Sequence, residues 1–191
     1  MKFNAYLAVL FVILLAGCAK QPVENHRYFL PETANTNQPA SKPSSRLMQI
    51  REVQLADFLS DGGLVLQLDD ITLNQAKNHL WAEDLRQQIN RGLRERLNQQ
   101  QQNITVVGPQ QANAEWRLSL EINAFHGRHD GLALTSGQWQ IQNDKGQILS
   151  LQPFYLQTAL RTEGYPALVR ALGENLDALA VSLAESIASI P

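Results

Sequence analysis

The stretch Trp116-Arg117-Leu118-Ser119-Leu120-Glu121-Ile122-Asn123-Ala124 alternates apolar and polar side chains along its whole length. Successive side chains of a β-strand point to opposite faces, so this alternation predicts a strand with one buried face and one face in water. Antiparallel strands commonly show such one-sided burial. The stretch therefore indicates a sheet that is covered by other elements on one face only.

Further strands extend this sheet in both directions along the chain. After a loop at residues 127–131, residues 132–142 alternate again, and Asn143-Asp144-Lys145-Gly146 has the composition of a turn. Residues 148–156 then return as a third strand, in which Pro153 indicates an edge or a bulge. Upstream of the alternating stretch, we expect shorter strands at residues 27–31, 47–53, 64–68, 71–73 and 104–107.

A different spacing of apolar residues predicts two helices. Trp81 is expected to open the first helix, in which apolar residues recur every four positions from residue 82 onward. Pro166 is well suited to the first turn of the second helix, which is expected to run nearly to the C-terminus. The apolar stripes comprise Leu85, Ile89, Leu93 and Leu97 in the first helix, and Leu172, Leu176, Leu179, Leu183 and Ile187 in the second. A mostly antiparallel sheet with both helices on one face would bury these stripes, which predicts an α+β two-layer sandwich.

The N-terminus has the features of a secretory signal peptide. Lys2 precedes an apolar stretch at residues 5–15, which is followed by the small residues Ala16 and Gly17. The apolar stretch is shorter than the roughly 20 residues that a membrane-spanning helix needs. We therefore assign residues 1–17 to a signal peptide.

Cys18 is the single cysteine of the chain, and Leu15-Ala16-Gly17-Cys18 resembles the lipobox of bacterial lipoproteins. The resemblance implies S-linked diacylglycerol and an N-acyl group on Cys18 after cleavage before it, and no other cofactor is expected. An ordinary signal peptide with an incidental cysteine is the alternative. Residues 18–26 would then form a lipidated tether and residues 27–191 a single domain, with a mobile loop at residues 32–45 that lacks large apolar side chains.

Composition and motifs argue against several classes of function. The formal net charge of −2 gives no electrostatic footprint for nucleic acid. His126, His129 and Asp130 are close in sequence, but we expect a solvated turn there and no metal site. Asp69-Asp70 and Glu83-Asp84 are interpreted as a strand end and a first helical turn rather than acid/base pairs. No nucleophile elbow or phosphate-binding glycine loop occurs, so we expect no enzyme and no catalytic residues.

Short motifs along the whole chain resemble one family. They are Tyr28-Phe29-Leu30, Asn78-His79-Leu80-Trp81-Ala82, Phe125…Gly127…Asp130-Gly131, Ser136-Gly137-Gln138-Trp139 and Gly164-Tyr165. Together with the lipobox they resemble the ABC-type transport auxiliary lipoprotein family. The resemblance implies a periplasm-facing lipoprotein of the outer membrane, partnered with an MCE-domain protein that reaches from the inner membrane. Ala19 after the cysteine agrees with sorting to the outer membrane.

The expected function is that of a lipid-anchored adaptor in intermembrane lipid transport and envelope integrity, which docks the MCE-domain protein to the outer membrane. One alternative is an adaptor lipoprotein of another envelope process, such as activation of peptidoglycan synthases. A small hydrolase or lipid-modifying enzyme is a third interpretation, and a homo-oligomer is left open. Family-like residues outside the helical stripes are the candidate partner-binding residues: Trp81, Gly127, Asp130, Gly131, Gly164 and Tyr165.

Overall fold

The computed structural model describes residues 24–32, 44, 46–100, 103–111 and 113–190. The signal peptide, residues 18–23 of the tether and all of the expected loop except Glu32 and Ser44 lie outside these residues. The elements in chain order are β1 (His26–Tyr28), β2 (Leu47–Leu55), the 3-10 helix η1 (Asp57–Leu59), β3 (Gly63–Gln67), β4 (Leu73–Trp81), α2 (Leu85–Gln100), β5 (Thr105–Val107), β6 (Trp116–Arg128), β7 (Leu132–Asn143), β8 (Ile148–Ala159) and α3 (Tyr165–Ser189).

The strands of the described chain form one mixed, open sheet of eight strands. β6 lies at its centre and pairs along one edge with β7, and along the other first with β2 and then with β3. The long ladders β6·β7 and β7·β8 are antiparallel, as is β3·β4, whereas β1·β4, β2·β5, β2·β6 and β3·β6 are parallel. The expected α+β class is confirmed, and the sheet is mixed, since four of its seven described ladders are parallel.

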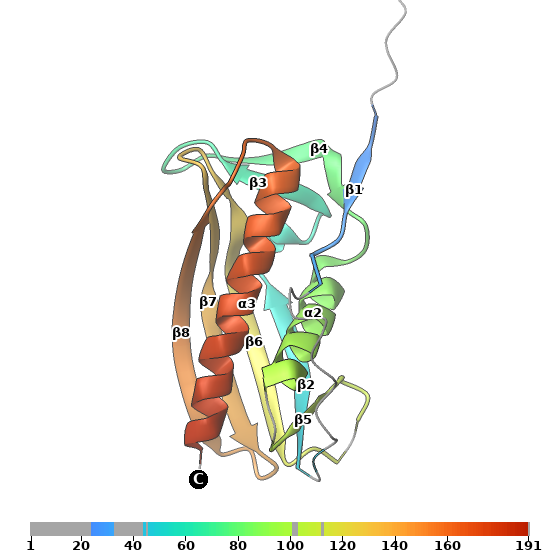
Figure 1. Cartoon of the computed structure of the whole chain (residues 1–191), viewed down its shortest axis with the longest axis vertical. Helices are drawn as coiled ribbons and strands as arrows, with labels where there is room; N and C mark the ends of the chain where they lie inside the picture. Colours follow the sequence, from blue (N-terminus) through green and yellow to red (C-terminus); the bar gives the residue numbers. More distant parts are fainter. Residues whose placement is uncertain (1–23, 33–43, 45, 101–102, 112, 191) are drawn as a thin grey trace, which may run out of the picture.

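Both helices cover the same face of the sheet (Figure 1). α2 packs against β2 and β5, while α3 packs against β6, β7 and β8 and also contacts α2. The opposite face is open, and polar side chains such as Glu121 and Gln138 lie on it, joined by a hydrogen bond of 2.7 Å. The expected arrangement of two helices on one face is therefore confirmed.

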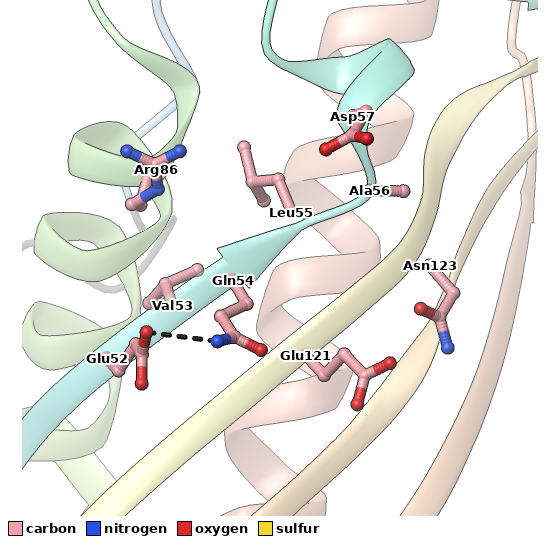
Figure 2. A pocket seen from close by; sticks show the side chains of 9 residues that line it. All are labelled: Glu52, Val53, Gln54, Leu55, Ala56, Asp57, Arg86, Glu121 and Asn123. Atoms are coloured by element: carbon pink, nitrogen blue, oxygen red, sulfur yellow. Dashed lines mark hydrogen bonds between the residues drawn. The ribbon is translucent and has the colours of Figure 1, made fainter.

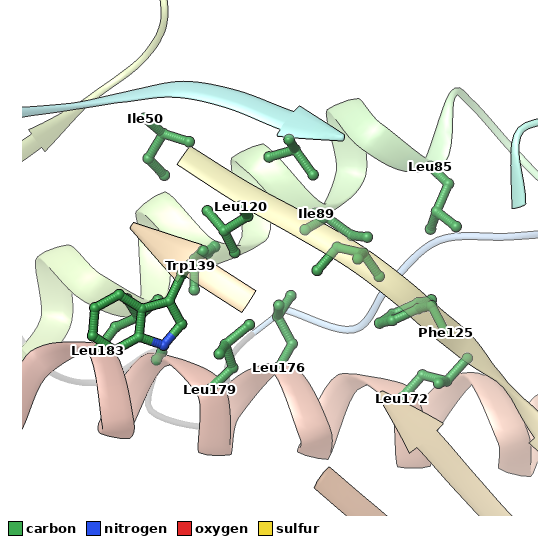
Figure 3. Packing of buried hydrophobic residues seen from close by; sticks show 14 of the residues in the cluster. Ile50, Leu85, Ile89, Leu120, Phe125, Trp139, Leu172, Leu176, Leu179 and Leu183 are labelled. Atoms are coloured by element: carbon green, nitrogen blue, oxygen red, sulfur yellow. The ribbon is translucent and has the colours of Figure 1, made fainter. Parts of the chain in front are cut away.

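The core lies between the helices and the sheet (Figure 3). Leu118, Leu120 and Ile122 of β6, which belong to the alternating stretch, are at most 2% exposed. Trp139 of β7 points from the sheet toward the helix face that carries Leu179 and Leu183. Every apolar residue predicted for the two helical stripes is buried in this core. The apolar faces predicted from the helical and strand periods thus pack against each other at one interface.

Most of one strand was not predicted, since the strand expected at residues 71–73 overlaps β4 only at Leu73. The sequence analysis expected Trp81 to open a helix, but Trp81 is the last residue of β4, and α2 begins only at Leu85. β4 is mostly polar and partly exposed, so it lacks the pattern of a half-buried strand. It is held instead by its neighbours, with β3 pairing on one edge and β1 on the other. These pairings depend on tertiary structure and leave no local signal.

Gly137 marks a close contact between strands. A Cβ atom at this position would lie 1.9 Å from the carbonyl oxygen of Glu121 on β6, so only glycine fits there. The register of the β6·β7 ladder shifts at this place, between Ile122 and Ala124. This agrees with the interpretation of Ser136-Gly137 as a packing feature.

A polar side chain also links α3 to the sheet. Nδ2 of Asn175, which is 1% exposed, donates to the carbonyl oxygen of Ala133 and to the Thr135 hydroxyl, both at 3.1 Å. Its Oδ1 accepts a hydrogen bond of 2.8 Å from the Thr158 hydroxyl. Because these groups are satisfied where they are buried, they fix the position of α3 over β7 and β8. Neither helix that the structure describes has the length and apolarity needed to cross a bilayer.

Candidate functional site

Aromatic side chains from three separate segments meet at one end of the sheet. The ring of His79 on β4 stacks on that of Tyr165, the first residue of α3, with centroids 4.1 Å apart. The His79 ring also stacks with those of His26 and Tyr28, both from β1, with centroids 5.0 Å and 5.8 Å apart. The hydroxyl of Tyr28 and Nδ1 of His79 are 2.8 Å apart. We call His26, Tyr28, His79 and Tyr165 the aromatic cluster.

Backbone geometry explains why these segments converge. β1 runs parallel to the end of β4, in a register that pairs His26 with His79. Gly164 has φ of 98°, a conformation that favours glycine, and its carbonyl accepts the first backbone hydrogen bonds of α3 from Ala167 and Leu168. This turn places the Tyr165 ring against the His79 ring.

Two members of the cluster have shifted pKa values. Burial lowers the pKa of His79, and the nearby His26 lowers it further. Burial also raises the pKa of Tyr28, with a smaller contribution from Tyr165. The Tyr28 hydroxyl therefore keeps its proton and donates to the neutral imidazole of His79. Such a patch can stack on and hydrogen-bond a protein partner, since aromatic residues are enriched at interfaces.

The structure gathers the six predicted partner-binding residues at this end of the molecule. Tyr165 belongs to the aromatic cluster and Gly164 precedes it. Asp130 and Gly131 lie in the exposed β6–β7 turn, where Asp130 pairs with Arg128 at 2.6 Å and Gly131 has φ of 80°. These residues are accessible from outside the fold, and their role in binding stays a prediction.

Two of the six residues lie inside the fold. Trp81 is 5% exposed, and its ring centroid is 6.1 Å from that of Phe125. Gly127 is buried, and a Cβ atom there would lie 2.9 Å from Cδ1 of Leu66 and 3.0 Å from Cδ2 of Leu168. Both residues shape the surface from beneath, so a partner would contact their neighbours rather than their own side chains.

The sequence analysis did not single out His26, Tyr28 or His79 as site residues. Tyr28 and His79 did belong to the family-like motifs, but their partnership spans 51 positions of the chain. One signal in the sequence could have indicated them: the family-like motifs contain aromatic residues that belong to no helical or strand period.

The histidines of the β6–β7 turn do not form the solvated group that was expected. His126 is 5% exposed and its ring lies 6.2 Å from that of Phe58, while its Nδ1 is 2.9 Å from the carbonyl oxygen of Gly127. Burial lowers the pKa of His126. Only His129 and Asp130 are exposed. Among the residues that the structure describes, no group of three or more His, Cys, Asp or Glu is placed to hold a metal ion.

The acidic pairs shape the backbone. The carboxylate of Asp69 accepts hydrogen bonds from the backbone N–H groups of Ile71 at 3.0 Å and Thr72 at 2.7 Å, and these bonds lower its pKa. Oδ1 of Asp84 accepts from the N–H of Gln87 at 3.1 Å, as expected for a residue capping α2. Glu83 forms an ion pair with Arg91. These contacts are structural and supply no acid/base pair.

A polar groove lies between β2 and α2 (Figure 2). Its volume is about 500 Å³, and its lining includes Arg86 of α2 together with the acidic residues Glu52, Asp57 and Glu121. An adjoining hollow of about 550 Å³ continues along α2 past Arg91 and Arg94. The mixed charges and the open shape suit a polar segment of a partner better than a lipid tail.

The sequence and structure resemble known envelope lipoproteins. The family described as "ABC-type transport auxiliary lipoprotein component" matches residues 28–184. Intermembrane transport lipoprotein PqiC of Escherichia coli (strain K12) is 30% identical over 186 residues, which cover 97% of this chain and 98% of the relative. PqiC of Shigella flexneri matches to the same extent.

Solved structures share the fold. A crystal structure of an uncharacterized protein superposes with a TM-score of 0.75 and 28% identity, covering 86% of this chain and 99% of that one. Protein XCC0632 from Xanthomonas campestris gives a TM-score of 0.62 at 13% identity, covering 83% and 91% of the two chains, and this likeness concerns the fold alone.

Proposed function

Because the chain belongs to the ABC-type transport auxiliary lipoprotein family, we propose that it is a lipid-anchored adaptor without catalytic activity. In this proposal it sits at the outer membrane, facing the periplasm, and docks an MCE-domain protein of a Pqi-type system that is anchored in the inner membrane. The observation that carries the proposal is the similarity to PqiC along nearly the whole chain. An intermembrane transport lipoprotein belongs to the cell envelope. We propose in addition that, within the envelope, this protein is located at the outer membrane.

The lipid anchor makes a partner necessary. Acyl chains on Cys18 would hold the domain at one membrane, since two or more chains bind a bilayer nearly irreversibly. Transport between membranes then requires a protein that reaches from the other one. The site supports binding rather than chemistry, because its accessible residues offer aromatic stacking and hydrogen bonds.

The proposed docking surface combines the aromatic cluster with the predicted residues that are accessible, Asp130, Gly131, Gly164 and Tyr165. Its stacked rings come from β1, β4 and α3, so a partner that contacts them is held by the folded domain and not by the tether. Binding should therefore persist when Cys18 is replaced by alanine.

Site-specific photocrosslinking tests the proposal. A photoreactive residue at Tyr165 or Asp130 should capture the MCE-domain protein, and one at Arg86 should report whether the groove along α2 takes part. The exposed Ala178 in the middle of α3 is the matched control position. Capture of peptidoglycan synthases alone, with the domain folded, would favour the alternative adaptor. Capture of neither class from Tyr165 or Asp130 would remove the proposed surface.

Self-association is a further part of the proposal. β8 pairs only with β7 among the described strands, which leaves one edge of a 12-residue strand unpaired. Leu151 and Tyr155 on this strand are 52% and 62% exposed. Exposed apolar edge strands favour pairing with another chain, so we propose contact between copies through β8. Light scattering should give a mass above one chain, and Leu151→Lys should lower it.

A further inference from the structure

The hairpin between β3 and β4 exposes apolar side chains. Ile71 at its turn is 88% exposed, and Leu68 and Leu73 on either side are 46% and 42% exposed. Single exposed apolar residues are common on protein surfaces, but three on one turn form a patch that indicates a binding surface. We call Leu68, Ile71 and Leu73 the hairpin tip.

Hydrogen bonds hold the hairpin tip in shape. The N–H of Leu68 donates to the carbonyl oxygen of Thr72 at 2.9 Å. The Asp69 carboxylate accepts from the N–H groups of Ile71 and Thr72. Because these backbone groups are already satisfied, the turn presents Ile71 outward without leaving those N–H groups unpaired when water is removed.

The hairpin tip lies at the same end of the molecule as the start of the described chain. β1 runs parallel to β4, so residues before His26 approach from the side on which β4 begins. The hairpin and the start of β1 both lie at the upper end in Figure 1, whereas the C-terminal end of α3 lies at the lower end. α3 has 25 residues and is about 37 Å long, so the two ends are well separated.

The sequence places the anchor near the upper end. Six residues lead from Cys18 to Glu24, where the described chain begins. Six residues span at most about 22 Å. An acylated Cys18 therefore keeps the upper end, and the hairpin tip with it, near the bilayer. The lower end lies farther away by the length of α3.

We propose that the hairpin tip rests on the membrane that holds the lipid anchor, with Ile71 inserted among the phospholipid head groups. Zwitterionic phospholipid is the matching surface, because Asp69 and Asp70 directly precede Ile71 and residues 64–76 contain no basic residue. On the neighbouring β6–β7 turn, Arg128 is paired with Asp130. The contact requires the lipid anchor but no partner protein, so it stands or falls separately from docking of an MCE-domain protein.

The single cysteine of the natural chain makes a fluorescence test direct. With Cys18 acylated, Ile71→Cys introduces a free thiol, which can carry an environment-sensitive dye. Ile148→Cys is the matched control, since Ile148 is also exposed, at 56%, but begins β8 at the lower end (Figure 1). The acylated chain is reconstituted into vesicles of phosphatidylethanolamine and phosphatidylcholine that contain a head-group quencher lipid.

The proposal expects quenching of the dye at position 71 and none at position 148. A dye at Asp70→Cys should also be quenched, and Ile71→Asp in the same chain should abolish that quenching. Equal quenching at positions 71 and 148, or none at position 71, would overturn the proposal. So would a native chain without acyl groups, because the orientation of the domain depends on the anchor.

Discussion

Arg96 of α2 binds Asp177 of α3 across the helix pair, with Nε of Arg96 2.6 Å from Oδ1 of Asp177. The same guanidinium donates to the carbonyl oxygen of Pro31 at 2.9 Å, although the arginine is only 2% exposed. The preceding residue, Leu30, is held in a similar way, since its N–H donates to Oε1 of Gln88 at 2.8 Å. Hydrogen bonds thus fasten the chain that follows the tether to α2, and Arg96 links this contact to Asp177 of α3.

Replacing Arg96 should therefore be costly. Arg96→Ala leaves the Pro31 carbonyl without its donor and Asp177 without its cation, and we expect a loss of about 3 kcal/mol of unfolding free energy. Arg161→Ala is the matched control, because Arg161 is 83% exposed and its pair with Glu174 should contribute less than about 1 kcal/mol. Urea denaturation of both variants measures the difference, and equal losses would contradict it.

The apolar stripe of α3 gives a second comparison. Leu176 is 1% exposed and packs in the core, whereas Val181 on the same helix is 46% exposed. Leu176→Ala should lower the unfolding free energy by about 2–5 kcal/mol, the range for deleting a large buried side chain. Val181→Ala should stay within about 0.5 kcal/mol of the natural chain. Thermal unfolding that ranked the two variants the other way would mean that α3 faces the sheet differently.

Stability should depend on pH through the buried His126 and the half-buried His79. The pKa values of His126 and His79 lie below the ordinary value of 6.5, chiefly because burial disfavours the charged imidazole. Below about pH 6.5 the unfolded chain then binds more protons than the folded one, so the unfolding free energy falls as the pH is lowered. His126→Gln should flatten this dependence. Urea midpoints at several values between pH 7 and pH 5 measure the slope, and a natural chain without one would refute the assignment.

Cys18→Ala tests the anchor. No other thiol can accept the diacylglycerol, so the variant should carry no fatty acid and should remain an uncleaved precursor. Metabolic labelling with an alkyne fatty acid, followed by gel analysis, measures both effects. A second lipoprotein of the same cells serves as the labelling control. Label retained by the variant would rule out lipidation at Cys18.

The periodic elements could be predicted from the sequence because each of them is buried on one face. β6 and β7 follow the alternation of apolar residues, and α2 and α3 follow their leucine stripes. In each case the spacing of apolar residues, every two in a strand or every three to four in a helix, indicates which side packs against the core. The family-like motifs named Asp130 and Tyr165 as candidate partner-binding residues, and that role stays a prediction.

β4 and the environment of His126 could not be predicted in this way. β4 is a strand because β1 and β3 flank it, although its own residues are mostly polar. His126 lies in β6, which continues past the alternating stretch that ends at Ala124, and its ring is near that of Phe58, from a segment almost 70 residues earlier. In both cases the deciding neighbour is remote in sequence, so no local pattern contains the information.

The sequence by itself determined the two-layer α+β architecture, the buried stripes and the single cysteine that points to a lipid anchor, because periodicity and composition are local properties. Tertiary structure alone decided that His26, Tyr28, His79 and Tyr165 stack in one cluster. It also placed the β3–β4 hairpin at the end of the molecule where β1 begins (Figure 1). Both arrangements depend on strand pairing between distant segments, and hydrogen bonds between backbones carry no signature in the residues that make them.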